Sequence, residues 1–156
     1  MDKLDQLILD ELQRDARISN AELARRVNLS PPATLARVKR LEENQYIQRY
    51  VAILDRKKAN FDMLCFVRVS LQLHDTDLVT GFHKAIRKMP EVLECHHVTG
   101  DYDYLLKVVA YNTKDLENFL VRRLTPVPGI AQIHTSLVLR EVKNSSVIPL
   151  RNAPGK

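Results

Sequence analysis

Residues 19–41 read SNAELARRVNLSPPATLARVKRL and contain the signals that decide the fold of the first part of the chain. Ser19 can cap a helix, and Glu22 follows it at the spacing of a capping box. The apolar positions of this helix are Leu23, Ala24 and Val27. Asn28 then tolerates the left-handed backbone that a sharp turn requires. We therefore predict a short helix followed by a tight turn.

A second helix starts directly after that turn. Ser30 is a good N-cap, and Pro31 suits the first helical position. The helix runs to about Asn44, and we expect its inner face to carry Leu35, Val38 and Leu41. A preceding helix over residues 3–15 has one apolar stripe, formed by Leu4, Leu7, Ile8 and Leu12. Three helices of which the last two are joined tightly indicate a helix-turn-helix.

Residues 46–53 follow with little turn material and predict a short wing or an outgoing strand. We accordingly assign residues 1–53 to a winged helix-turn-helix domain. Residues 54–61 are polar and basic, which is typical of a linker.

The charge of the chain is concentrated in the helix-turn-helix. The 156 residues include 24 Lys and Arg against 19 Asp and Glu, a net charge of +5. Residues 1–16 hold two basic and five acidic side chains, whereas residues 17–40 hold six basic and one acidic. A solvated helical face would explain such a run, but its coincidence with caps and a tight turn favours binding to double-stranded DNA.

The composition excludes several other classes of protein. With 45% hydrophobic residues a packed core is expected, and no apolar run approaches the roughly 18 residues that span a bilayer. The acidic start is no signal peptide. Two cysteines are too few for a disulfide scaffold, so we expect a cytoplasmic protein without membrane partners.

Residues 62–143 predict an α+β domain of the order β-α-β-β-α-β, the ferredoxin-like split motif. Its first strand alternates perfectly from Met63 to Leu73, and its last spans Ile130 to Val142. Residues 144–156 contain two prolines and a glycine and are expected to form a loosely held C-terminal tail.

The outer face of the helix over residues 31–44 mixes small side chains with long guanidinium groups, which suits contact with base edges and phosphates. Arginines on the preceding helix and the wing add phosphate contacts. The candidate DNA-binding residues are Arg17, Arg25, Arg26, Ser30, Pro32, Ala33, Ala36, Arg37, Arg40 and Arg49.

Residues 5–15 (DQLILDELQRD), 17–30 (RISNAELARRVNLS) and 37–42 (RVKRLE) resemble the DNA-binding half of the leucine-responsive/asparagine (Lrp/AsnC, "feast/famine") regulators. Residues 94–107 (ECHHVTGDYDYLLK) are similar to the signature of that family's amino-acid-binding half. The resemblance covers residues 2–148. It implies a transcriptional regulator that forms dimers, an octameric or similar ring of dimers, and a small amino-acid effector, such as leucine or methionine, bound where dimers meet.

The loop around Gly100 has two interpretations. From the residues alone a hairpin turn is favoured, because Gly-Asp is ordinary turn chemistry. The resemblance favours effector binding, in which backbone N–H groups meet a carboxylate and an aspartate meets an ammonium group. On that interpretation the effector-binding residues are Gly100, Asp101, Tyr102, Asp103, Tyr104 and, by the resemblance alone, Thr99, Thr125 and Ser136.

The sequence predicts no metal site and no cofactor. His96 and His97 point to opposite faces of a strand, and Cys95 with His97 gives only two ligands. No phosphate loop or nucleophile elbow occurs, so we expect no enzyme. Two alternatives to a regulator are an architectural protein that wraps DNA and a haem-pathway decarboxylase, whose family resembles this one in both domains.

Overall fold

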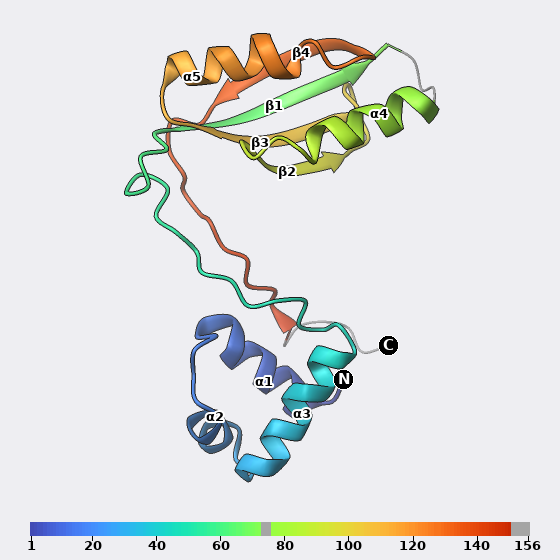
Figure 1. The fold of residues 1–156 in the computed structure, drawn as a ribbon. Coiled ribbons are helices and arrows are strands. Elements are labelled where there is room, and N and C mark those ends of the chain that lie inside the picture. The colour runs from blue at the N-terminus through green and yellow to red at the C-terminus, as the bar shows by residue number, and fades with distance from the viewer. Residues whose placement is uncertain (73–75, 151–156) are drawn as a thin grey trace. The chain divides into compact units, whose positions relative to one another are not determined.

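The computed structural model describes residues 1–72 and 76–150, which form two compact units. Residues 1–53 and the segment that begins at Lys143 form the first unit, and residues 54–142 form the second. Figure 1 shows the three helices of the first unit and the sheet of the second.

Three helices build the first unit: α1 (Lys3–Arg14), α2 (Asn20–Val27) and α3 (Pro31–Glu43). The predicted caps are confirmed. Ser19 accepts a hydrogen bond from the backbone N–H of Glu22, and Ser30 accepts one from Ala33. Asn28 adopts the left-handed conformation with φ 55°, which closes the tight turn between α2 and α3. The helix-turn-helix is therefore specified by local signals.

The core of the first unit is small and aliphatic. Side chains from all three helices meet in it, namely Ile8, Leu9, Leu23, Val27 and Leu41. Removal of this apolar surface from water stabilises the three-helix arrangement.

The inner face of α3 differs from the prediction. Leu41 is buried and Val38 partly so, but Leu35 is 59% exposed and Thr34 takes its place in the interior. The Thr34 hydroxyl donates to the carbonyl oxygen of Ser30, 3.1 Å away, so its polar group is satisfied inside the unit. A polar residue that bonds to its own helix can thus replace a leucine on the buried face.

A strand, one of the two predictions for residues 46–53, is not found: the structure assigns no strand anywhere between residues 44 and 62. An extended segment forms a ladder only with a neighbouring strand, and no described segment of this chain pairs with it. Tyr50 instead bonds through its hydroxyl to Glu42. The basic stretch that follows is folded rather than loose, because Asp55 accepts hydrogen bonds from the N–H groups of Lys57 and Lys58.

The expectation of a loosely held tail is not met over residues 144–150. The Gln13 side chain on α1 forms two hydrogen bonds with Ile148, one to its carbonyl oxygen and one from its N–H. Leu150 packs against the core of the first unit. Residues 151–156, the remainder of that predicted tail, lie outside the described part of the chain.

The second unit has the predicted β-α-β-β-α-β order. Its strands are β1 (Met63–Leu71), β2 (Val92–His97), β3 (Tyr104–Ala110) and β4 (Ile130–Leu137), which form an antiparallel sheet in the order β2-β3-β1-β4. The alternation of β1 is confirmed from Cys65 to Leu71, whereas Leu64 is buried as well as Cys65. Of the predicted extension to Leu73, Gln72 lies outside the strand and Leu73 lies outside the described residues.

Two helical segments cover one face of this sheet: α4 (Thr76–Ile86) and α5 (Thr113–Asn118), which continues into the π-helix η1 (Phe119–Leu124). Phe82 of α4 and Phe119 of η1 join the same buried cluster as Val67 and Val69 of β1. The opposite face presents Phe66 and Arg68. The side chains of one sheet face are therefore left without a covering layer of helices within the described chain.

The last strand is shorter than predicted. We expected it to reach Val142, but β4 ends at Leu137, which pairs with Cys65 of β1. One more hydrogen bond joins the N–H of Val138 to the carbonyl oxygen of Leu64. Beyond this point only Met63 of β1 remains, so the length of the neighbouring strand limits the length of β4.

Candidate nucleic-acid interface and effector loop

The outward face of α3 is defined by its exposed residues. Pro32, Leu35, Ala36, Lys39 and Glu43 lie on it, Arg40 lies at one edge, and Ala33 is half-buried at the same side. Two of the predicted contact residues, Pro32 and Ala36, therefore occupy its centre. Leu35 and Lys39 belong to the same face, although neither was among the predicted contacts.

Arg37 and Arg40 are bound to the N-terminus of α1. Arg37 Nη1 lies 2.7 Å from a carboxylate oxygen of Asp2 and 2.7 Å from one of Asp5, and Arg40 Nη2 lies 2.9 Å from both oxygens of Asp5. The Asp5 side chain is only 3% exposed and that of Arg37 25%. We call these four residues the buried ion cluster. It joins α3 to α1 and draws Arg37 away from the outward face.

The pKa values of both aspartates reflect these contacts. The backbone N–H of Asp5 and then the guanidinium of Arg37 lower the pKa of Asp2. Burial acts to raise the pKa of Asp5, but the backbone N–H of Asp2 and the Arg37 guanidinium outweigh it, and the net pKa is lowered. Both carboxylates also complete the capping box of α1. The cluster is thus ionised near neutral pH.

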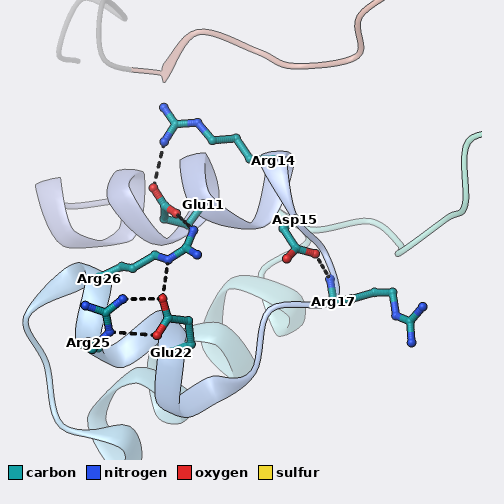
Figure 2. A network of polar contacts seen from close by, with 7 residues as sticks. All are labelled: Glu11, Arg14, Asp15, Arg17, Glu22, Arg25 and Arg26. Carbon is teal, nitrogen blue, oxygen red and sulfur yellow. Dashed lines mark hydrogen bonds and ion pairs between the residues drawn. The ribbon is translucent and has the colours of Figure 1, made fainter.

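A second group of charges lies on α1 and α2 and is shown in Figure 2. Glu22 accepts two hydrogen bonds from Arg25, at 2.7 and 2.8 Å, and one from Arg26 at 2.9 Å. Glu11 accepts one from Arg26 and one from Arg14, each at 2.8 Å. We call these five residues the exposed ion network. With three guanidinium groups and two carboxylates it keeps a net positive charge.

The exposed ion network differs from the buried ion cluster in its contact with water. The Arg25 side chain is 75% exposed. Hydrogen bonds from Arg25 and Arg26 lower the pKa of Glu22 to about 2. Because the arginines remain accessible, a phosphate oxygen can take the place of a carboxylate oxygen at either guanidinium.

The remaining predicted DNA contacts are accessible or used in capping. Arg17 bonds through its backbone N–H to Asp15, and Figure 2 shows its guanidinium directed away from that carboxylate. Among the described residues its guanidinium has no ion-pair partner. Arg49 is exposed, and Ser30 is exposed but uses its hydroxyl to cap α3.

The second predicted site lies in the loop between β2 and β3. Thr99, Gly100 and Asp101 are exposed, and Gly100 has φ 129°, a conformation that side chains other than hydrogen rarely allow. Asp103 is held at the end of β1: its carboxylate accepts from the N–H of Leu71 at 2.7 Å, and its own N–H donates to Val69. The structure therefore brings the loop to the carboxyl end of β1.

The other residues predicted to bind the effector lie at different positions in the second unit. Tyr102 lies beneath the guanidinium of Arg68. Tyr104 is buried on the helix-covered face, where its hydroxyl lies 2.9 Å from His83 Nε2. The Thr125 hydroxyl donates to the carbonyl oxygen of Leu120 in η1, and Ser136 is exposed on β4 opposite Phe66. Within one chain, the described contacts do not join Thr125 or Ser136 to the Gly100 loop.

Within residues 1–72 and 76–150, no group of three or more His, Cys, Asp and Glu residues is arranged to hold a metal ion. Cys65 is buried and Cys95 exposed, and both are free thiols. None of the helices in the described ranges has the length and apolar character needed to cross a membrane.

A helix-turn-helix with an exposed basic surface, joined to a separate four-stranded β-α-β-β-α-β unit, places the chain in the class of two-domain DNA-binding proteins. Two family models match it: a winged helix-turn-helix DNA-binding model over residues 1–48 and the Lrp/AsnC ligand binding domain over residues 64–148. The chain belongs to the Lrp/AsnC family of transcriptional regulators, as its sequence resemblance implied.

Individual relatives agree with this assignment. The leucine-responsive regulatory proteins of Klebsiella pneumoniae and Escherichia coli are each 40% identical over 151 residues, 97% of this chain and 92% of theirs. A transcriptional regulator of Neisseria meningitidis, solved as a complex with L-Met, is 36% identical with a TM-score of 0.93 and covers 97% of both chains. An AsnC family regulator of Agrobacterium tumefaciens is 31% identical, also with a TM-score of 0.93, and covers 99% of this chain and all of that one.

Proposed function

We propose that the chain regulates transcription by placing α3 in the major groove of DNA and that a small amino acid modulates this binding. The observation that carries the proposal is the outward face of α3, where short side chains allow close approach of the helix and basic side chains lie around it. The exposed ion network and Arg17 supply the positive surroundings that a phosphate backbone requires.

Salt titration tests the DNA-binding half of the proposal. Binding to a fluorescent duplex should weaken steeply as salt rises, because each neutralised phosphate releases counterions. Arg17→Ala should make the slope of log K against log salt shallower by about one. Arg122→Ala in η1 is the matched control: it removes an exposed arginine from the second unit and should leave the slope unchanged. Equal slopes for all three proteins would contradict the assigned surface.

The effector half rests on the Gly100 loop. Exposed backbone N–H groups can receive the carboxylate of an amino acid, and the exposed carboxylate of Asp101 can receive its ammonium group. We assign Asp103 a structural role rather than a contact with the effector, since its carboxylate already accepts a hydrogen bond from the N–H of Leu71. We propose a hydrophobic amino acid such as leucine or methionine, which the names of the relatives support.

A calorimetric panel of the twenty amino acids tests this half. A hydrophobic amino acid should bind, and Asp101→Asn should weaken that binding about tenfold or more, because one charge-assisted hydrogen bond contributes roughly 1.5–3 kcal/mol. Asp101→Asn should leave the unfolding midpoint unchanged, whereas Asp103→Asn should lower it. Failure of all twenty to bind would contradict the effector proposal while leaving DNA binding standing.

We further propose that the protein forms dimers that assemble into an octamer or a similar ring. The uncovered sheet face supports self-association, since the large apolar side chain of Phe66 lies exposed on it, on the inner strand β1. Phe66→Glu should reduce the mass measured by light scattering during size-exclusion chromatography. An unchanged mass would exclude this face as the interface.

A further inference from the structure

Leu35 is a large apolar side chain that is more exposed than buried. It projects from the outward face of α3, 59% exposed, while the aliphatic side chains of α3 that face the other helices are buried or half-buried. Pro32 and Ala36 lie beside it on the same face and are also exposed. The centre of this face is therefore an apolar strip, which we call the Leu35 strip (Pro32, Leu35 and Ala36).

The polar groups that would ordinarily read base edges are held elsewhere. Arg37 and Arg40 extend to Asp5 at the N-terminus of α1. Arg25 is held by Glu22 on α2. Within the central part of the face, Lys39 is the basic side chain next to the Leu35 strip. The outward face of α3 thus combines an apolar strip with Lys39, which pairs with Glu43 on the same face at 3.8 Å, while the arginines are bound to carboxylates outside it.

The charge of the helix-turn-helix argues for duplex DNA as the occupant of the strip. A protein partner would match an apolar strip with apolar side chains, but residues 17–40 hold six basic side chains and one acidic, and Arg17, Arg25 and Lys39 are all exposed. A polyanion matches that surface. A major groove that receives α3 would bring base edges against the Leu35 strip.

Leucine can recognise only one base in the major groove. It has no hydrogen-bond donor or acceptor, so it cannot read the edges of adenine, guanine or cytosine. Thymine alone among the four bases presents a methyl group there. We propose that Leu35 is a specificity-determining residue that packs against the C5-methyl group of a thymine and so selects a T·A pair at that position of the operator. This inference rests on the proposed insertion of α3 into DNA.

The test removes the methyl group from the DNA and the side chain from the protein. Operators are first selected with the full-length protein from random duplexes, and each thymine is then replaced by deoxyuridine, which differs only in that methyl. We expect about fourfold weaker binding at one thymine of each half-site, the loss expected for one buried carbon. Leu35→Ala should bind the thymine and uracil operators equally. These changes form a double-mutant cycle, in which direct contact predicts that the effects of removing the methyl group and of removing the leucine side chain are not additive.

Two further variants control for indirect effects. Leu35→Met keeps an apolar side chain of similar reach and should retain the preference for thymine. Lys39→Ala on the same face should weaken binding to both operators by the same factor and leave the preference intact. Because Leu35 is exposed, none of these changes should alter the unfolding midpoint.

The outcomes separate the two proposals. If the wild-type protein binds no duplex above background, the proposed DNA-binding function fails. If it binds but every uracil operator is bound as tightly as its parent, or Leu35→Ala retains the preference, the assignment of Leu35 is wrong. A change in oligomeric mass in Leu35→Ala would also overturn it, because the strip would then be covered by a second copy of the chain.

Discussion

The buried ion cluster and the exposed ion network both pair arginines of the first unit with carboxylates, but they differ in their exposure to water. The buried ion cluster holds two arginines and the exposed ion network three, each with two carboxylates at similar distances. In the buried ion cluster the central carboxylate is 3% exposed, so the contacts fix α3 against α1. In the exposed ion network the arginines remain in water. Similar ion pairs therefore stabilise the packing of α3 against α1 in the buried ion cluster. In the exposed ion network they leave arginines that can exchange a carboxylate for a phosphate.

The largest effect should come from Asp5→Asn. This change leaves two guanidinium groups without their shared carboxylate, and we expect the first unit to lose about 2–3 kcal/mol, less than the roughly 3–5 kcal/mol of a fully buried pair because Arg40 stays half exposed. Denaturant unfolding, with hydrogen exchange of peptides from α1 and α3, measures the loss.

Asp2→Asn is the matched control for that experiment. Asn still caps α1, and the lost carboxylate is half exposed, so the cost should stay below about 1 kcal/mol. Equal losses of stability in Asp5→Asn and Asp2→Asn would contradict the distinction between the buried carboxylate of Asp5 and the half-exposed carboxylate of Asp2.

Acid should progressively remove the contribution of ionised Asp5 to the free energy of unfolding. The pKa of Asp5 is lower in the folded state than in the unfolded chain, so its contribution is complete above about pH 4 and is lost as the pH falls through its folded-state pKa. Thermal unfolding between pH 2 and pH 6 should show the midpoint falling below pH 4. The decline should be shallower in Asp5→Asn, and parallel curves for the two proteins would argue against the cluster.

Arg37→Lys should have an intermediate effect. One guanidinium nitrogen contacts both Asp2 and Asp5, and a lysine ammonium has a different reach and geometry. We expect a smaller loss than for Asp5→Asn, since positive charge is retained while hydrogen bonds to ionised partners are weakened. Denaturant unfolding measures it, and full stability in the lysine variant would show that charge alone suffices.

The smallest effect should come from the exposed ion network. Glu22→Gln frees Arg25 and Arg26 for phosphate, and exposed ion pairs contribute only about 0.2–1 kcal/mol, so affinity for a random duplex should rise by no more than about fivefold. Fluorescence anisotropy measures it. Glu117→Gln, an exposed change of the same charge in the second unit, should raise affinity less; an equal rise would attribute the effect to net charge.

The sequence predicted those parts of the fold that local patterns control. Ser19, Asn28 and Ser30 act on their immediate neighbours, so the turn of the helix-turn-helix was predictable from their identity. The strict alternation in β1 likewise predicted a strand with one buried face.

Features that depend on distant residues were not predictable in the same way. The predicted orientation of α3 was wrong at Leu35, because Thr34 occupies the interior position with its hydroxyl bonded to the carbonyl oxygen of Ser30. The buried ion cluster joins residues more than thirty positions apart, although the acidic start of the chain beside a basic stretch was a signal of it. Tyr104 faces the core, which the alternation of Leu106 and Val108 along its own strand already indicated. The predicted effector contacts stay predictions.

The hydrogen bonds between Gln13 and Ile148 have a consequence for synthesis of the protein. The helix-turn-helix leaves the ribosome before the second unit, yet some of its contacts are made by residues that emerge after that entire unit. The first unit is thus begun before the second unit and completed after it. A chain that ends after Val142 would contain all three helices and still lack the segment that closes over α1.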